Sequence, residues 1–320
     1  MLRFILFRVA RWIPSALFLL FVVYAMAFYG AGDPIRIMFL REGGDVVYDE
    51  ERLDAIRESQ GLNDPFLEQF GRYLGNYLTG NMGYSLIHKR PILEMIAVAA
   101  PVSIQMGLAA TLLVAMMAIP AGVLAALNHN SWLDNLIVGT AQFFWAIPVF
   151  VAGPLLMVLL VLGLKIMDVP YGWHGLFNTK TILPLLVLSF QPMAIIIRQA
   201  RSAVLEVLGE DYIRTARAKG IPERVVVFRH ILRPVLTPVV TQLGLILITI
   251  INGAMLLEVT FGLPGLGLMT VNSVTQSDYP AILAIVLIGS FLTMMANLFV
   301  DVIYPLLDPR AAQPQRGSDV

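Results

Sequence analysis

The sequence predicts an all-α membrane protein with six transmembrane helices and an extracytoplasmic helical segment between helices 1 and 2. Of the 320 residues, 58% are hydrophobic and only 14% are charged, and charge-free stretches exceed the roughly 20 residues that cross a bilayer. The formal net charge is zero, so no overall field points to a nucleic-acid partner. The chain has no cysteine and four scattered histidines, so we expect neither disulfides nor a metal site.

The first predicted helix lies within residues 1–29, where an apolar run from Trp12 to about Phe28 follows three arginines and no acid. A charged start before an apolar run also resembles a signal peptide, and Ala25-Met26-Ala27 could serve as its cleavage site. The apolar run is long for a signal peptide. We therefore expect the segment to be retained as an N-terminal transmembrane helix.

Residues 30–97 are expected to form an extracytoplasmic cap, and they hold seven basic and eleven acidic residues. Within them, 49–62 is predicted to be a mostly polar helix and 64–78 an amphipathic one. The apolar positions of the second helix are Phe66, Phe70, Tyr73, Leu74 and Leu78. We expect these helices to pack on the outer ends of the membrane helices; the alternative is a mobile loop.

Residues 98–305 are expected to form the membrane core. Its five helices are predicted at 98–127, 135–164, 181–197, 237–257 and 281–305. The helix at 135–164 is interrupted by Pro148 and Pro154. Between the last two helices, 258–280 is uncharged through its middle and rich in glycine, which favours a re-entrant or surface segment over a span. The tail, 306–320, is expected to be frayed.

Basic residues in the connections predict the orientation. Residues 198–236 hold eight basic against four acidic residues, and the N-terminal segment holds three arginines and no acid. Residues 30–97 instead have an excess of four acids. With six helices, the two termini, the turn at 128–134 and the 198–236 segment share one side, which the positive-inside rule makes cytoplasmic.

A charged stretch, DYIRTARAKGIPERVVVFRH at 211–230, lies between two apolar runs. It cannot lie in hydrocarbon, where each Arg or Lys costs about 2.5–3.5 kcal/mol. The composition of SAVLEVLGEDYIRTARAKG, residues 202–220, favours helix, with Gly209 weakening the pattern once, and Gly220-Ile221-Pro222 ends one helix and starts another. We predict a short helix, a glycine turn and a second helix that returns to the membrane.

Two roles fit this charged element. Ala216 and Ala218 beside Gly220 would allow another backbone to approach, and exposed basic residues would contact the rim of a groove in a cytoplasmic partner. Alternatively, the element only anchors the chain to anionic lipid headgroups. The residues by themselves leave both roles open.

Large polar residues are few within the predicted spans, where such groups either face a cavity or hold helices together. The candidates for a translocation path or for bonding between helices are Gln105, Gln142, Gln191, Gln242, Asn252, Asn297 and Asp301. In the glycine-rich segment, Phe261, Pro264, Gly265 and Gly267 could form a gate at the outer face, or a plain turn at the lipid interface.

The charged element resembles the cytoplasmic coupling loop, or EAA loop, of ABC importer permeases. In the general pattern Glu-Ala-Ala precedes a glycine by six to four residues; here these positions are Arg214, Thr215 and Ala216, with Gly220 retained. The missing acid departs from the broad pattern, but RTARAKG is similar to the branch that imports dipeptides, oligopeptides and nickel.

Further stretches resemble the first-permease type of that branch. The Ile-x-Leu-Pro that follows the glycine in the general pattern is nearly matched by Ile231, Leu232 and Pro234. The other similar stretches are RFILFRVARWIPSALFLLFVVYAM near the N-terminus, GLNDPFLEQFGRYL (61–74), GNMGYSL (80–86), EVTFGLPGLG (258–267) and DYP (278–280). The resemblance extends to about Arg310 and implies a type I ABC importer permease fold.

The resemblance also implies partners. A P-loop needs Gly-x4-Gly-Lys-Ser/Thr, and none of the four lysines here follows a glycine. ATP and Mg²⁺ would therefore bind two separate cytoplasmic ATPase subunits, with a second homologous permease, an extracytoplasmic binding protein and the lipid of a bacterial or archaeal inner membrane completing the system. The implied ATPase-coupling residues are Asp211, Tyr212, Arg214, Thr215, Ala216, Arg217, Ala218, Lys219, Gly220 and Ile221.

The implied function is ATP-driven import of dipeptides or oligopeptides, in which this chain forms half of the translocation path and is not itself an enzyme. Nickel chelates, glutathione-like tripeptides and oligosaccharides also suit such a protein. An intramembrane enzyme would need paired charged or nucleophilic groups within the spans, where only Asp301 is available. A stand-alone secondary transporter should show an internal repeat and a midplane ionisable site, and neither is evident.

Overall fold

The computed structural model describes residues 2–30, 54–55, 57–58 and 63–307, which are predominantly helical. The β-type pairing among them is an isolated bridge between Tyr84 and Pro91. Most of the polar helix predicted at 49–62, and the tail beyond Leu307, lie outside the described residues.

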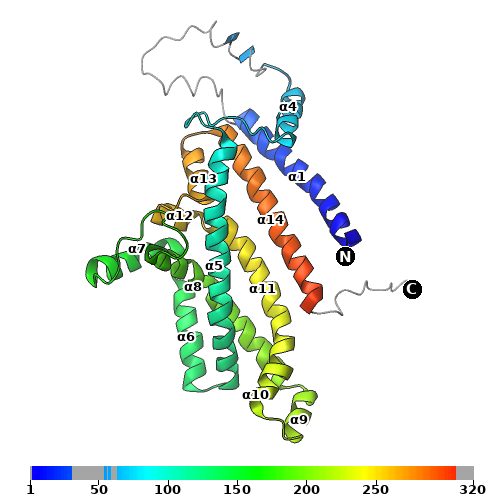
Figure 1. The fold of residues 1–320 in the computed structure, drawn as a ribbon, viewed down its shortest axis with the longest axis vertical. Coiled ribbons are helices and arrows are strands. Elements are labelled where there is room, and N and C mark those ends of the chain that lie inside the picture. Colours follow the sequence, from blue (N-terminus) through cyan, green and yellow to red (C-terminus); the bar gives the residue numbers. More distant parts are fainter. Residues whose placement is uncertain (1, 31–53, 56, 59–62, 308–320) are drawn as a thin grey trace. The chain divides into compact units, whose positions relative to one another are not determined.

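The helices follow one another along the chain as Figure 1 labels them. Those of the first half are α1 (Leu2–Gly30), α4 (Phe66–Leu78), α5 (Ile92–Leu127), α6 (Trp132–Ala146), α7 (Val149–Met157) and a π-helical segment, η1 (Val158–Gly163). Those of the second half are α8 (Thr179–Leu208), α9 (Asp211–Ala218), α10 (Glu223–Val225), the π-helical η2 (Val226–Ile231), α11 (Leu232–Gly253), α12 (Met255–Phe261), α13 (Leu266–Thr275) and α14 (Tyr279–Leu307).

Five helical stretches in the described part of the chain are long and apolar enough to cross a membrane. They lie in α1, α5, α8, the run from α10 to α11, and α14. Two bent helix pairs pass the same test, namely α6 with α7–η1, and α12 with α13. Counting the first pair as one span gives the six transmembrane helices that the sequence predicts, and the second pair covers most of the segment expected to be re-entrant or superficial.

The helix predicted at 135–164 is bent by 97°. Ile147 is extended, with φ −90° and ψ 117°, as a residue before a proline prefers, so α6 ends at Ala146. Pro154, in contrast, lies inside α7 without ending it. The prediction of two interruptions is therefore corrected to one break, at Pro148.

By its internal contacts the chain divides into two compact units. Unit 1 comprises residues 1–101 and 264–294, and unit 2 comprises residues 102–263 and 295–320. In unit 1, α4 packs on α1 through aromatic rings: Phe21 meets Phe66 and Phe70 edge to face, with centroids 5.3 and 5.5 Å apart. The ring centroids of Tyr24 and Tyr73 lie 4.9 Å apart. Each such pair adds about 0.5–1.5 kcal/mol to the burial of the rings, so these contacts fix the predicted amphipathic helix on α1.

A buried carboxylate joins the loop after α4 to the start of α14, also within unit 1. Asp278 is 1% exposed and accepts hydrogen bonds from the Ser85 hydroxyl and from the Leu86 amide, the latter at 3.1 Å. Its backbone carbonyl accepts the Ile282 amide at 2.9 Å. A buried carboxylate without donors would be costly, so Asp278 holds the 84–91 loop against the first turn of α14.

In unit 2, the backbones of α5 and α8 approach closely where α5 carries small residues four apart: Ala118, Gly122 and Ala126. A Cβ added at Gly122 would lie 2.6 Å from the carbonyl oxygen of Ile197 and 2.8 Å from the Cβ of Ala200. Because the nearest of these atoms is backbone, the two helices could not accommodate a side chain at this position without moving apart.

α8 continues to Leu208 instead of ending at 197 as predicted. The Arg198 guanidinium lies 5.3 Å from the centroid of the Trp145 ring, and Arg201 pairs with Asp134. Both arginines thus have partners in unit 2, and their charge does not force the chain to leave the helix. The sequence assigns them to a loop only because neither partner is near them in the chain.

We predict that Gly122→Ala lowers the free energy of unfolding by about 1–3 kcal/mol, the usual cost of overpacking a filled contact. Gly139→Ala is the matched control, because Gly139 is exposed on α6 and nothing lies within 4 Å of its added Cβ. Alanine is the better helix former, so this control should be neutral or stabilising. Thermal unfolding of the purified chain in detergent checks both variants; equal stability of the two would contradict the close contact.

Candidate coupling site

The element predicted around 211–220 is the short helix α9, which a single break separates from α8. Gly209 caps α8, and Glu210 is extended, with φ −73° and ψ 142°. The Glu210 carbonyl accepts the amides of Ile213 and Arg214 at 3.1 and 3.4 Å, and these bonds begin α9. The glycine that weakens the sequence pattern is therefore the place where the long helix ends.

α9 ends in a glycine turn of the Schellman type. Gly220 has φ 73°, in the left-handed region that favours glycine. Its amide donates to the Arg217 carbonyl at 2.9 Å, and the Ile221 amide donates to the Ala216 carbonyl at 3.3 Å, which are the two bonds that define this turn. Pro222 then precedes α10. The predicted helix, glycine turn and returning helix are confirmed.

An ion pair bridges the turn on its outer side. Arg217 in α9 donates to both carboxylate oxygens of Glu223 in α10, at 2.6 and 3.2 Å. These hydrogen bonds raise the pKa of Arg217, which therefore remains charged. The two side chains are 45% and 55% exposed, so the pair contributes at most about 1 kcal/mol. Its two-pronged geometry mainly fixes the angle between α9 and α10.

The inner face of α9 packs into unit 2. Ile213 is fully buried and Ala216 is 6% exposed, and both belong to the hydrophobic core that contains Val226 and Ile231 of η2. The prediction that Ala216 admits the backbone of another protein is therefore wrong, because its side chain packs within this chain. Ala218 is the small residue that stays exposed.

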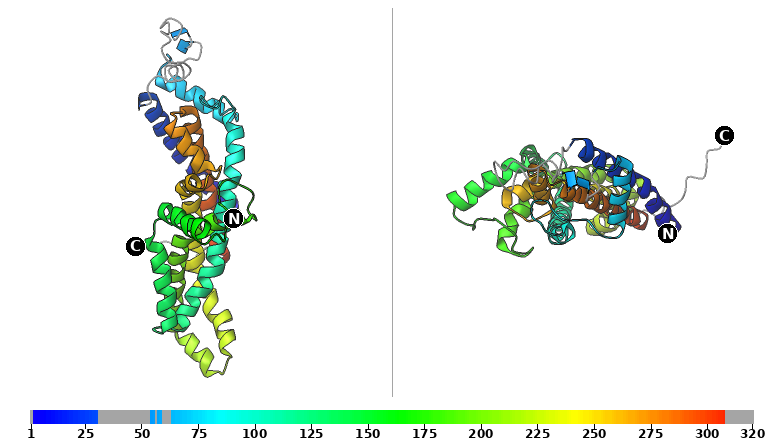
Figure 2. Two further views of the ribbon diagram at one scale, coloured as in Figure 1. Left: turned by 90° about the vertical axis from the view of Figure 1, so that its left-hand side faces the viewer. Right: turned by 90° about the horizontal axis from the view of Figure 1, so that it is seen from above.

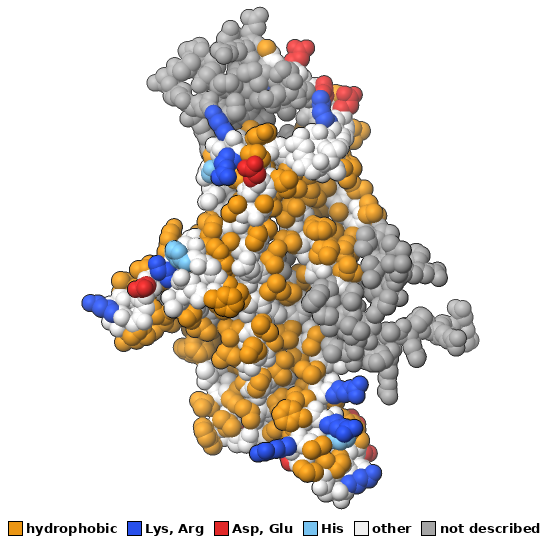
Figure 3. Space-filling model, in the orientation of Figure 1, with side chains coloured by type: hydrophobic (Ala, Val, Ile, Leu, Met, Phe, Trp, Pro, Cys, Tyr) orange, Lys and Arg blue, Asp and Glu red, His pale blue; other side chains and the backbone are white. Residues whose placement is uncertain are grey.

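The other predicted coupling residues lie on the outer face of α9 and in the turn after it, at one end of unit 2, where Figure 3 shows Lys and Arg side chains gathered. The side chains of Asp211 and Arg214 pair at 3.6 Å, yet they are 97% and 74% exposed. Partial burial raises the pKa of the Tyr212 hydroxyl, although the side chain remains 44% exposed. The remaining exposed positions are Thr215, Arg217, Ala218, Lys219 and Gly220, with Ile221 half-buried.

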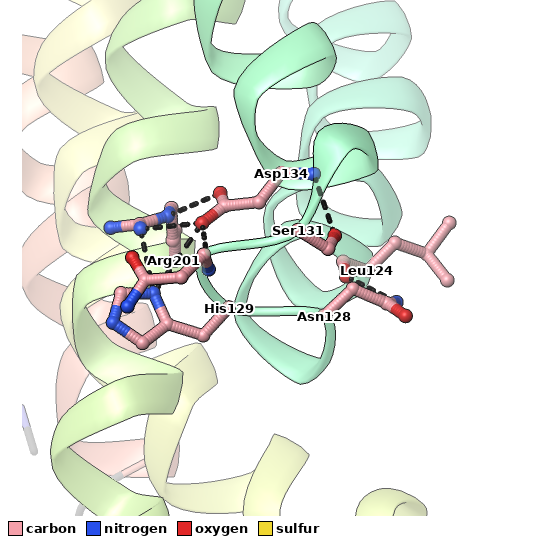
Figure 4. Close-up of polar contacts among 7 residues, drawn as sticks. Leu124, Asn128, His129, Ser131, Asp134 and Arg201 are labelled. Atoms are coloured by element: carbon pink, nitrogen blue, oxygen red, sulfur yellow. Dashed lines mark hydrogen bonds and ion pairs between the residues drawn. The ribbon is translucent and has the colours of Figure 1, made fainter.

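A buried ion pair fixes the helix that leads to α9. Asp134, in the first turn of α6, is 2% exposed and accepts Nε and Nη2 of Arg201, each at 2.7 Å (Figure 4). Nη2 also lies 2.9 Å from Nδ1 of His129; because a guanidinium only donates, this ring nitrogen accepts. The Asn130 amide donates to Asp134 at 3.0 Å, and the Ser131 hydroxyl caps α6 by accepting the Asp134 amide at 3.3 Å.

This network joins the turn between α5 and α6 to the C-terminal half of α8. That turn and α9 lie toward the same end of unit 2 in both Figure 1 and Figure 2. The short helix is therefore attached to a helix that is held at Gly122 and again at Asp134.

A second buried acid in unit 2 is Glu258 in α12, which is 1% exposed. The hydroxyl of Ser103, a fully buried residue of α5, donates to its Oε1 at 2.6 Å. The Glu258 carbonyl accepts the Leu263 amide at 2.9 Å across Gly262, whose φ is 61°. These bonds hold the end of α12 against α5.

The polar residues predicted within the spans do not form one cluster of buried groups. Those that are exposed are Gln105, Gln142 and Asn297, and those that are half-buried are Gln191 and Gln242. Asn252 and Asp301 lie in α11 and α14, but their side chains are outside the described part of the structure. The exposure of the first three favours contact with a path, a partner or lipid over bonding between helices of this chain.

The residues predicted as an outer gate are divided between the two units. Phe261, in unit 2, is fully buried, and a Cβ added at Gly153 would lie 3.2 Å from its ring. In unit 1, Pro264 is exposed, Gly265 precedes the first residue of α13, and Gly267 is half-buried. Phe261 is thus a core residue, whereas Pro264 is accessible.

Three acids that the structure buries, Asp134, Glu258 and Asp278, are not among the site residues predicted from the sequence. Each had a signal, since each is an acid beside a long charge-free stretch, where an unbonded carboxylate would be costly. Their side-chain partners lie 67, 155 and 193 residues away, which one sequence cannot reveal. Among the described residues, no three His, Asp or Glu side chains come together as a metal site would need.

The described part of the chain thus combines long apolar helices with a short polar helix, α9, that ends in a glycine turn. Residues 118–313 match the family model described as "Binding-protein-dependent transport system inner membrane component", and the chain belongs to this family. It is therefore a multi-pass inner-membrane component of a transport system rather than an enzyme, as the sequence predicts.

Within this family the chain is similar to peptide permeases. It is 36% identical over 311 residues to the oligopeptide transport system permease protein OppB of Salmonella typhimurium, covering 97% of this chain and 99% of that one. It is 36% identical over 320 residues to the oligopeptide transport system permease protein AppB of Bacillus subtilis, with the same coverage. Similarity to the dipeptide transport system permease protein DppB of Escherichia coli is 32% over 338 residues, covering 97% and 98%. The predicted resemblance to the peptide branch of ABC importer permeases is confirmed.

A solved structure shares the fold. It is described as inward-facing conformations of the MetNI methionine ABC transporter, and it matches with a TM-score of 0.56 at 16% identity, covering 68% of this chain and 98% of that one. The predicted fold class, an all-α membrane protein of the ABC importer permease type, is confirmed.

We predict that Arg201→Gln lowers the free energy of unfolding by about 3–5 kcal/mol, because it leaves the Asp134 carboxylate buried without its cation. The double variant Asp134→Leu with Arg201→Leu should recover most of this loss, since both charges are removed together. Unfolding of the purified chain in detergent provides the measurement.

The control for that prediction is Arg214→Gln, which removes the cation of an exposed pair and should change stability by no more than about 1 kcal/mol. Equal effects of Arg201→Gln and Arg214→Gln would contradict the importance of the buried pair.

Proposed function

We propose that this chain is a permease subunit of an ATP-driven importer and forms half of the translocation path for dipeptides or oligopeptides. The observation that supports this proposal is α9, a short helix outside the apolar spans that has an exposed polar face and ends in the glycine turn at Gly220. The cargo is inferred from the relatives, which are oligopeptide and dipeptide permease proteins.

In this proposal, α9 docks on an ATPase subunit, and ATP and Mg²⁺ bind there rather than on this chain. The complete system contains two cytoplasmic ATPase subunits, a second homologous permease and an extracytoplasmic binding protein. Both termini, the 128–134 turn and the 198–236 segment lie on the cytoplasmic side. Residues 30–97 then form the outer cap, 98–305 the permease core and 306–320 the cytoplasmic tail.

The geometry of α9 supports its use as a lever. Its inner face is buried through Ile213, its turn is held by two backbone bonds, and Arg217 ties it to Glu223. A partner that pulls on the outer face would therefore move α9 and α10 together. The motion would pass to α8 on one side and to η2 and α11 on the other, and these helices would tilt.

The translocation path is proposed to use the polar residues that this chain leaves accessible. Gln105, Gln142 and Asn297 are exposed along otherwise apolar helices, as expected where a second permease completes an aqueous path. At the outer end, Pro264 is the exposed residue of the proposed gate, with Gly267 half-buried and Gly265 buried behind it in unit 1.

We predict that Gly220→Val abolishes ATP-dependent uptake while the chain still inserts. A β-branched residue at φ 73° costs about 1–3 kcal/mol of backbone strain, so α9 would leave its angle. Gly220→Asn should keep much of the uptake, because asparagine tolerates left-handed backbone. The measurement is uptake of a labelled oligopeptide by proteoliposomes that contain the whole transporter.

Gly80→Val is the matched control for Gly220→Val. Gly80 has φ 79° and nothing within 4 Å of an added Cβ, so the backbone strain is similar but lies beyond α4. Uptake should survive this change. Normal uptake with Gly220→Val, or equal loss with Gly80→Val, would count against the lever.

Because the chain has no cysteine, single thiols can test the orientation and the docking partner. Lys219→Cys should react with a membrane-impermeant maleimide only after spheroplasts are opened, whereas Lys165→Cys, in the loop before α8, should react in intact spheroplasts. A thiol-to-amine cross-linker should join Lys219→Cys, and not Lys165→Cys, to an ATPase subunit. The reverse accessibility, or no ATPase cross-link from position 219, would refute the proposed docking.

A further inference from the structure

Three arginines line one surface groove of about 540 Å³ just after the glycine turn, in unit 2. They are Arg224, Arg229 and Arg233, and the groove is completed by Val225 and Phe228. Figure 3 shows basic and hydrophobic side chains next to one another at this end of the unit. The groove is not part of the α9 face that the proposed function uses.

The π-helical segment η2 explains how the arginines come to share a face. In an α-helix, residues five apart are turned by about 140° from each other, so Arg224 and Arg229 would diverge. In η2 the hydrogen bonds span five residues, as in the bond from the Leu232 amide to the Val227 carbonyl. Residues five apart across this segment are then turned less from each other than in an α-helix, and Arg233 follows Arg229 at the ordinary four-residue spacing of α11.

The charge of the groove is not compensated within the described part of the chain, where none of the three arginines forms an ion pair or hydrogen bond. Glu223, the acid beside Arg224, is bonded to Arg217 instead. Arg214 likewise has its own acid, Asp211, at 3.6 Å. Three guanidinium groups around one groove, with no acid bonded to them, favour the binding of an anionic ligand. The planar guanidinium group can donate two parallel hydrogen bonds to the oxygens of a phosphate.

The groove also presents an apolar surface, since Phe228 is 72% and Val225 is 41% exposed. A soluble anion such as inorganic phosphate would leave this surface in water. A ligand with a phosphate and an acyl chain would cover both kinds of surface.

The position along the helix fits the headgroup region of a bilayer. Residues Glu223–Ile250 form one of the stretches long and apolar enough to cross a membrane. The hydrocarbon core accommodates about 20 residues, and Ile231–Ile250 fills it. Arg224 and Arg229 then lie outside the hydrocarbon, and Arg233, in the first turn of α11, can extend its guanidinium back to the interface.

We propose that this groove, hereafter the arginine groove, binds the headgroup of an anionic phospholipid, with its phosphate among the three arginines and its glycerol and first acyl carbons against Phe228. The ligand class is a phosphate diester that carries acyl chains, such as phosphatidylglycerol. The site lies between the glycine turn and α11, so the bound lipid steadies η2 where the returning helix enters the membrane. The assignment concerns the groove alone and does not depend on the cargo.

The test is native mass spectrometry of the full chain in detergent with added phosphatidylglycerol or phosphatidylcholine. The wild type should retain phosphatidylglycerol in preference to phosphatidylcholine. The triple variant Arg224→Gln, Arg229→Gln, Arg233→Gln should lose that preference, at about fivefold in affinity for each arginine removed. The matched control Arg90→Gln, Lys165→Gln, Lys180→Gln removes the same charge elsewhere and should retain it. Size exclusion and circular dichroism establish that both variants are folded.

Two further arms identify the ligand. Inorganic phosphate in large excess should not displace the lipid, and Phe228→Ser should weaken lipid retention while leaving the arginines in place. Displacement by phosphate, or no effect of Phe228→Ser, would overturn the lipid assignment. Equal retention by the two triple variants would overturn the site.

The competing occupant is an ATPase subunit, and the assembled transporter decides between the two. In nanodiscs of phosphatidylglycerol and phosphatidylcholine, the wild-type complex should retain more phosphatidylglycerol than the complex with the triple arginine variant. Equal retention, together with a cross-link from Phe228→Cys to an ATPase subunit, would assign the arginine groove to the protein interface and refute the lipid site.

Discussion

The bond between Asp134 and Arg201 is the contact on which the arrangement of unit 2 depends. It places a carboxylate that is 2% exposed against both nitrogens of one edge of a guanidinium, in a chain where only 14% of residues are charged. Two charge-assisted bonds are needed there because a buried charge without a partner is costly. They fix α8 beyond its close contact with Gly122, and α9 begins after a single break. The direction of the exposed helix is therefore determined by a contact well inside the protein.

The spans, the amphipathic α4 and the glycine turn could be predicted because local rules govern them: apolar length, periodicity and the preference of Gly220 for a left-handed conformation. The length of α8 could not be predicted, because Arg198 and Arg201 find partners on α6 that are distant in sequence. The inward direction of Ala216 was also missed, since the packing of Ile213 sets the rotation of α9. The exposed position of Gln105 could not be inferred from its polarity either, because the packing of α5 against other helices decides which of its faces is buried.

The two π-helical segments, η1 and η2, show another limit of sequence patterns. Each contains a hydrogen bond that spans five residues, such as the bond from the Leu164 amide to the Leu159 carbonyl at 2.8 Å. Such a segment shifts the phase of every residue that follows, so a helical wheel drawn through it assigns later residues to the wrong face. In η2 this shift lets Val226 and Ile231 share the core while the arginine groove forms on the surface.

The hydrogen bonds of Asp278 have a consequence for how the protein is made. Asp278 holds Ser85 and Leu86, whose positions precede it by 193 and 192 residues. A ribosome adds about 5–20 residues per second, so the loop waits roughly 10–40 s for its acid to be synthesised. During that time four or five later helices are inserted, while the 84–91 loop lacks its anchor. A nascent chain that stops before Asp278 would carry that loop without its anchor, as a target for proteases and chaperones.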